Sequence, residues 1–309
     1  MKRKRIQYNE LSEEIYGPKY WTRPKLIAIG AILLLFGFLF NFSLEDKINK
    51  WLLTTLSNNE ACPITFEKAE LSYFLPQIII KEPVILGSCF GQINNRLPLQ
   101  NIKLSLHSPS FYPPGVKMHA SIVAGKTKIN IYPVISPFSQ YIEIQDSQID
   151  SQLFAAMTSD NVSPIAGTLL VEGFLKIASG TLDDGQISIQ SENFYLPAQN
   201  IKGFDLTMMN LKHLSIRTHF TNNTNLQIDH IEVGQPGMPL ELKLKGSLRI
   251  DPNNFMNSQL QLTGSLHLTN YILVNFSFVK LFLPPENTSG TYQMKIFGPI
   301  GNLSPPQFN

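Results

Sequence analysis

The residues that could support catalysis or metal binding are few and widely spaced in this sequence. Its histidines are scattered, and spacings such as the six residues between His213 and His219 match no familiar zinc motif. Asp183 and Asp184 directly precede Gly185, which predicts a tight turn rather than a pair of catalytic acids. We therefore expect the histidines to occupy solvent-facing strand positions. The six are His107, His119, His213, His219, His230 and His267.

No known catalytic motif is present either. The sequence has no GxSxG, no HExxH and no phosphate-binding loop, and the Gly298–Gly301 stretch carries a proline where a phosphate loop needs free backbone N–H groups. We expect a non-enzymatic protein without catalytic residues, cofactor or metal. With 16% charged and 43% hydrophobic residues and a net charge of +2, the 309-residue chain is typical neither of a disordered protein nor of a nucleic-acid-binding protein.

The charge is distributed unevenly around one apolar segment. Residues 1–25 carry seven basic and three acidic side chains, whereas residues 45–309 carry 18 basic and 20 acidic ones. Between them, residues 26–40 contain no polar side chain. A helix over residues 26–44 would span roughly 28 Å, close to the bilayer core of about 30 Å. The sequence predicts that residues 26–44 form a transmembrane helix in the lipid bilayer. The basic tail before it is expected to be cytoplasmic, and the chain after it is expected to lie on the other side of the membrane.

Two alternatives to an uncleaved anchor are a signal peptide and a buried core helix. The apolar run ends in Phe38–Phe42 (FLFNF), which lacks the small residues of a signal-peptide cleavage site. A soluble core helix seldom lacks polar residues over fifteen positions.

Residues 45–60 are predicted to form a juxtamembrane helix, because Ile48, Trp51, Leu52 and Leu56 form one apolar stripe on a helix.

From residue 62 onward the hydrophobic pattern has a period of two. Alternation over short runs separated by Gly, Asn, Pro and Asp predicts antiparallel strands with one buried face. We expect a mostly β fold, a curved antiparallel meander with few short helices, the helices lying at residues 151–159 and 274–283. Representative runs are Ile102-Leu104-Leu106, Ile187-Ile189, Leu240-Leu242-Leu244 and Leu260-Leu262.

A weak repeat and a composition change suggest how this part is organised. Gly-[Ser/Thr]-Leu occurs at Gly167, Gly180, Gly246 and Gly264, and we expect each glycine to open a strand at a bend or bulge. Residues 62–150 contain several prolines and residues 160–306 are richer in leucine, which predicts an N-terminal and a C-terminal β subdomain.

The two cysteines, Cys62 and Cys89, both follow the predicted span. An even count in an oxidising compartment predicts one disulfide, and two buried free thiols are the alternative.

Several stretches of the C-terminal half resemble one protein family. The chain is similar to protein N of the bacterial type II secretion system in its layout of basic tail, single anchor and β-rich domain. The stretches that carry the resemblance are Ala166–Gly173 (AGTLLVEG), Leu182–Leu196 (LDDGQISIQSENFYL), Leu240–Ile250 (LELKLKGSLRI) and Ile296–Pro306 (IFGPIGNLSPP).

This resemblance implies an accessory component of the machinery that exports folded proteins from the periplasm. It implies a single-pass protein of the bacterial inner membrane, with a periplasmic β domain that contacts other secretion proteins and no catalytic residues. A second likeness is to AsmA-like periplasmic β proteins, which implies a groove that carries lipid between the two membranes. A long apolar strip left exposed on the sheet would favour this lipid-binding alternative.

Overall fold

The computed structural model describes most of the chain, which divides into two units. The first unit ends at Trp51 and the second runs from Leu52 to Asn309. The described residues are 23–41, 44–59, 62–72, 76–90, 95–111, 113–137, 139–155, 163–178, 181–201, 204–251, 254–275, 283–284 and 290–308.

Two helices lie in the N-terminal part of the described chain. Helix α2 is Arg23–Asn41 and helix α3 is Leu44–Ser57. Both predicted helices are therefore confirmed as helices, while the basic tail before residue 23 lies outside the described residues. On α3, Leu52 is buried but Trp51 is 64% exposed, so the predicted stripe is only partly covered. Nowhere in the described residues does a helix combine the length and apolar character needed to cross a membrane.

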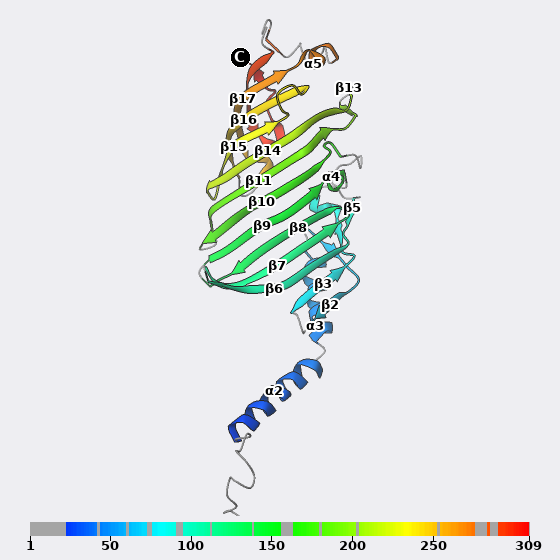
Figure 1. Cartoon of the computed structure of the whole chain (residues 1–309), viewed down its shortest axis with the longest axis vertical. Coiled ribbons are helices and arrows are strands. Elements are labelled where there is room, and N and C mark those ends of the chain that lie inside the picture. Colours follow the sequence, from blue (N-terminus) through cyan, green and yellow to red (C-terminus); the bar gives the residue numbers. More distant parts are fainter. Residues whose placement is uncertain are drawn as a thin grey trace, which may run out of the picture. The chain divides into compact units, whose positions relative to one another are not determined.

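The rest of the chain is mostly β, as the alternating pattern predicted. Fourteen strands form one sheet in which each strand pairs antiparallel with the next described strand of that sheet along the chain (Figure 1). The order in space is β19-β18-β17-β16-β15-β14-β11-β10-β9-β8-β7-β6-β3-β2. The strands are Ala69–Ser72 (β2), Gln77–Lys81 (β3), Asn101–Phe111 (β6), Pro114–Ala124 (β7), Thr127–Ile135 (β8), Ser139–Asp150 (β9), Thr168–Ala178 (β10), Thr181–Leu196 (β11), Met209–Asn222 (β14), Asn225–Val233 (β15), Leu240–Arg249 (β16), Gln259–Leu268 (β17), Thr291–Pro299 (β18) and Gln307–Phe308 (β19).

Smaller elements accompany this sheet. One three-stranded sheet pairs β4 with β1 and β5, and a hairpin pairs β12 with β13. Helices α4 and α5 begin inside or just before the two stretches predicted to be helical, and the rest of those stretches is mostly outside the described residues. The elements are Ile64–Thr65 (β1), Val84–Leu86 (β4), Arg96–Pro98 (β5), Gln199–Ile201 (β12), Phe204–Leu206 (β13), Gln152–Ala155 (α4), Asn270–Asn275 (α5) and the 3₁₀ turns Gly87–Phe90, Phe255–Asn257 and Ile300–Asn302.

The long sheet continues across the two predicted subdomains. Strand β9, in the 62–150 segment, pairs with β10, in the 160–306 segment, from Thr168↔Asp150 to Ala178↔Ser139. A meander needs no separate domains, because each strand finds its partner in the next one along the chain. The composition change near residue 160 is thus not a break in the sheet.

Two local predictions were wrong. Gly246 and Gly264 lie inside β16 and β17 rather than opening them, although Gly167 does directly precede β10; Gly180 is outside the described residues. Asp183 and Asp184 lie within β11 rather than in a tight turn, and Asp183 forms an ion pair with Lys176 across the strand pair. In both cases the neighbouring strand supplies hydrogen bonds that local sequence preference does not reveal.

Candidate functional site

The main feature of the long sheet is an unbroken apolar row that crosses thirteen strands. Residues directly opposite each other in an antiparallel ladder share a face, so successive pairings trace one line across the sheet. The line contains no charged residue, and Thr218 is its single polar side chain. From β2 to β18 the row is Leu71, Ile78, Leu104, Ala120, Ile131, Ile144, Gly173, Ile187, Thr218, Ile228, Gly246, Leu262 and Ile296.

A second row runs beside the first over the C-terminal strands. It is equally free of charge. It lies two residues along the strand from the first row on the same side of the sheet, or three residues on β15, where the register shifts between Ile228 and Ile231. We call the side that carries both rows the apolar face. The second row is Val171, Ile189, Ile216, Ile231, Leu244, Gly264, Met294 and Phe308.

Glycines on the apolar face let neighbouring strands approach each other closely. A Cβ on Gly246 would lie 1.9 Å from the carbonyl oxygen of Gln261, and a Cβ on Gly264 would lie 1.8 Å from that of Lys243. A Cβ on Gly173 would lie 2.3 Å from the carbonyl oxygen of Gln186. In each case the backbone of a neighbouring strand occupies the space into which the Cβ would point. The close approach of the strands at these three positions therefore requires glycine.

One side of the apolar face is closed by the segments that connect the strands. In Figure 1 the elements α4, β13 and α5 lie along the same side of the sheet. There Phe154 of α4 packs against a buried cluster that includes Leu211, and Ile272 of α5 is buried with Tyr292. These contacts cover apolar side chains at that end of the strands.

The opposite end of the first strands is open. Leu106, Val116 and Ile135 belong to the apolar face and are 52%, 48% and 58% exposed. Val116 pairs directly with Ile135, and Leu106 pairs with Met118 on the same strand as Val116. The apolar face thus has one covered side and one side that reaches solvent.

The other face of the sheet is polar, and it carries a shallow cavity of about 460 Å³. The charged and amide side chains there include Glu172, Gln186 and Arg217, with the near-parallel rings of Tyr141 and Phe174 5.9 Å apart. Burial, with the nearby carboxylates of Glu143 and Asp184, raises the pKa of Tyr141. A hydroxyl held neutral in this way offers a hydrogen bond but no base.

The histidines are not assembled into a metal site. Among the described residues no group of three or more His, Cys, Asp or Glu side chains is placed to hold a metal ion. His119 stacks on Tyr132 with ring centroids 4.7 Å apart, and His219 Nδ1 lies 2.8 Å from Asp229 Oδ1. These contacts are pairings between neighbouring strands on the polar face, the position expected from the sequence for His119 and His219.

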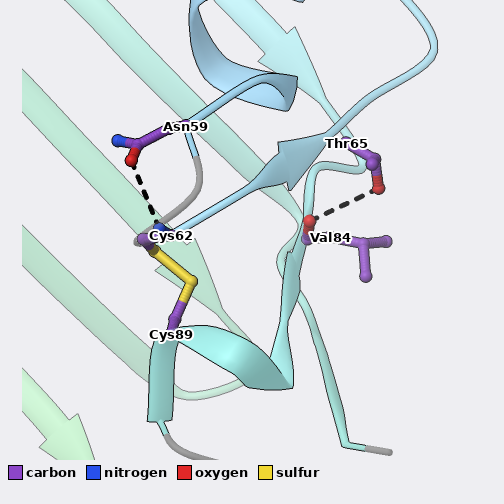
Figure 2. Close-up of a disulfide and its surroundings, with 5 residues drawn as sticks. All are labelled: Asn59, Cys62, Thr65, Val84 and Cys89. Carbon is purple, nitrogen blue, oxygen red and sulfur yellow. Dashed lines mark hydrogen bonds between the residues drawn. A yellow bond between two sulfur atoms is a disulfide. The ribbon is translucent and has the colours of Figure 1, made fainter. Parts of the chain in front are cut away.

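The predicted disulfide is present. Cys62 and Cys89 are bonded, with their Cα atoms 4.4 Å apart (Figure 2). Cys62 precedes β1 and Cys89 lies in the turn after β4, so the bond joins the start of β1 to the end of β4 at one end of this antiparallel pair. The backbone N–H of Cys62 donates to Asn59 Oδ1 at 3.4 Å, and Thr65 Oγ1 donates to the carbonyl oxygen of Val84 at 3.5 Å.

Sequence reasoning found the individual apolar strands but not the row that they form. Each alternating run was visible, and no signal in a single sequence states the register between runs. Comparison of this chain with protein-family models, with curated proteins and with solved structures gave no match.

Proposed function

We propose that this protein is non-enzymatic and binds lipid acyl chains along the apolar face of its long sheet. The observation that carries this proposal is the charge-free row across thirteen strands, together with the exposed Leu106, Val116 and Ile135 that continue the same face along β6, β7 and β8. A purely structural core would be closed at both ends of the strands. Exposed, contiguous apolar surface is typical of ligand or membrane contact.

The chemistry of the face suits a hydrocarbon chain rather than a polar ligand. The rows offer methyl and methylene groups and no side-chain charge, so nothing on the face would recognise a charged or sugar-like group. Charged side chains of the same strands lie on the opposite face, as Glu143 does beside Ile144. The headgroup of a bound lipid would therefore stay in water while its chains lie on the sheet.

Anchoring and location are part of the proposal. The apolar composition of residues 26–44 and the basic tail before them support a single span in the bacterial inner membrane with the sheet in the periplasm. The bonded pair Cys62–Cys89 is consistent with an oxidising compartment.

A second candidate function is an accessory role in the type II secretion machinery. Three of the four segments that carry the resemblance to its protein N lie mostly in β10, β11 and β16 of the long sheet, and the fourth begins in β18 of the same sheet. Strand β19 pairs with only Met294 and Lys295 of β18, which leaves most of that edge without a neighbouring strand among the described residues. Such an edge could accept a strand from another secretion protein.

Site-directed photo-crosslinking of the full chain in its membrane tests the lipid proposal. A photoreactive amino acid at Ile187, on the apolar face, is expected to crosslink to lipid that mass spectrometry identifies. The matched control carries the same group at Ser188, the next residue of β11, which lies on the polar face. Equal lipid crosslinking at both positions, or none at Ile187, would reject the proposal.

A deletion strain separates the two candidate functions. Secreted proteins and outer-membrane lipid composition are measured on the same cultures. Altered lipids with normal secretion favour lipid carriage, whereas exported proteins trapped in the periplasm with unchanged lipids favour the secretion machinery.

A further inference from the structure

The open end of the apolar face forms a projecting corner with an aromatic tip. Leu106, Val116 and Ile135 are joined there by Phe111, which is 92% exposed. Phe111 pairs with Pro114 beside the β6–β7 turn, two residues beyond Pro109, which pairs with Val116. Because the register shifts between Leu106 and Ser108, the alternation along β6 resumes with Pro109 and Phe111 on the apolar face. These four residues are the open corner.

The charges near the open corner neutralise each other. From Leu104 to Met118 and from Ile131 to Ile144 the sequence contains only two charged residues, Lys117 and Glu143. They lie on the polar face, and Lys117 Nζ is 3.0 Å from Glu143 Oε2. The ammonium also lies 5.0 Å from the ring centroid of Tyr132. The corner therefore brings no unpaired charge with it into an apolar medium, where such a charge is costly.

Its size and composition fit a lipid surface better than a protein. The four side chains expose on the order of 400 Å² of apolar surface, about half of what each partner buries in a standard protein interface. An exposed aromatic ring among aliphatic side chains at the tip of a hairpin is the composition that partitions into the bilayer interface.

We propose that the open corner docks into the surface of a lipid bilayer, so that acyl chains can pass between that bilayer and the apolar face. The passage of chains rests on the proposed function, whereas the docking itself stands on the exposure and charge pairing of the corner.

The test uses the full chain reconstituted in lipid nanodiscs and mixed with separate phosphatidylcholine vesicles. The measured quantity is the fraction of nanodiscs that float with the vesicles. The double variant Phe111→Ser/Ile135→Ser is expected to weaken binding of the nanodiscs to the vesicles at least about tenfold. The reason is that moving one such apolar side chain from water into lipid changes the partition constant by roughly tenfold. The control is Leu170→Ser/Phe297→Ser, which removes two exposed apolar side chains from the polar face.

Docking is supported if the nanodiscs float with the vesicles in the control variant but not in the corner variant. Flotation that survives in the corner variant, or that is absent from the unmodified protein, overturns it. Nanodiscs that pair with each other through the corner without vesicles would show that a second copy is the occupant, which also overturns it. Lipid crosslinking at Ile187 is measured in parallel. If that crosslinking is absent while flotation depends on the corner, lipid carriage fails and docking stands.

Discussion

Gly246 and Gly264 bring strands β16 and β17 together reciprocally. Each glycine has the other strand's backbone where its own Cβ would stand, at 1.9 Å from Gln261 O and 1.8 Å from Lys243 O. Side-chain rearrangement cannot relieve either contact, because both involve main-chain carbonyl groups. The close approach of the two strands at this point therefore depends on two hydrogen atoms in place of two methyl groups.

Gly264→Ala is accordingly expected to destabilise the sheet by about 3 kcal/mol, because the backbone must shift to admit the methyl group. Chemical denaturation of the full chain in detergent measures the change. The control is Ser265→Ala, one residue along the same strand and on the polar face. If the two variants unfold at the same denaturant concentration, the close approach of the strands does not require glycine.

Asn130 is expected to hold the irregular pairing of β8 with β9. The register shifts between Lys128 and Ile131, and Asn130 is buried there. Its backbone N–H donates to Ser147 Oγ at 2.9 Å, and its Nδ2 donates to the carbonyl oxygen of Asp146 at 3.0 Å. Asn130→Ala leaves that carbonyl and Ser121 Oγ without this partner, at an expected cost of about 2 kcal/mol.

Amide hydrogen exchange in β8 and β9 measures this effect, with the exposed Gln148→Ala on β9 as control. Asp146 has a positive φ of 46°, so faster exchange of its neighbours is expected when the hydrogen bond from Asn130 is lost. Unchanged protection in Asn130→Ala would mean that the strand pairing alone maintains this bulge.

The disulfide is expected to stabilise the small β1-β4-β5 sheet. Replacing both Cys62 and Cys89 by serine frees a loop whose ends are 27 residues apart, at a cost of about 3–4 kcal/mol in the chain-entropy model. The loss should be local. Amides of β1 and β4 should exchange faster, while those of β16 and β17 keep their protection. Loss of protection throughout the long sheet would contradict this.

The ion pair between Glu70 and Lys81 should make the β2 edge sensitive to acid. Lys81 Nζ donates to Glu70 Oε1 at 2.6 Å, and this hydrogen bond, with the charges of Lys81 and Lys68, lowers the pKa of Glu70 below its ordinary value of 4.5. A carboxyl group with a lowered folded pKa contributes stability above its unfolded pKa. That contribution is lost as the pH falls below 4.5 and passes through the folded pKa.

A carbon-13 titration of the Glu70 carboxyl group checks this directly. Lys81→Met should raise the pKa of Glu70 toward its ordinary value, because the donor and its charge are both removed. Lys245→Met, on distant β16, should leave the pKa unchanged. A titration curve that does not respond to Lys81→Met would show that the pair is not formed in solution.

Local sequence patterns predicted most of the elements of this protein. The alternation at Leu240-Leu242-Leu244 predicted a strand with one apolar side, and β16 is that strand. The pattern failed where long-range pairing outweighs local preference. Asp183-Asp184-Gly185 resembles a turn, yet it lies in β11 because β10 supplies a ladder partner as far as Thr181.

Side-chain periodicity and residue type within short windows were enough to predict the strands, their apolar sides and the two cysteines that could pair. They did not predict that the apolar sides join in one row, that strands approach closely at Gly246 and Gly264, or that one corner stays exposed. Register and close strand approach are set by contacts between strands that meet only when the chain folds.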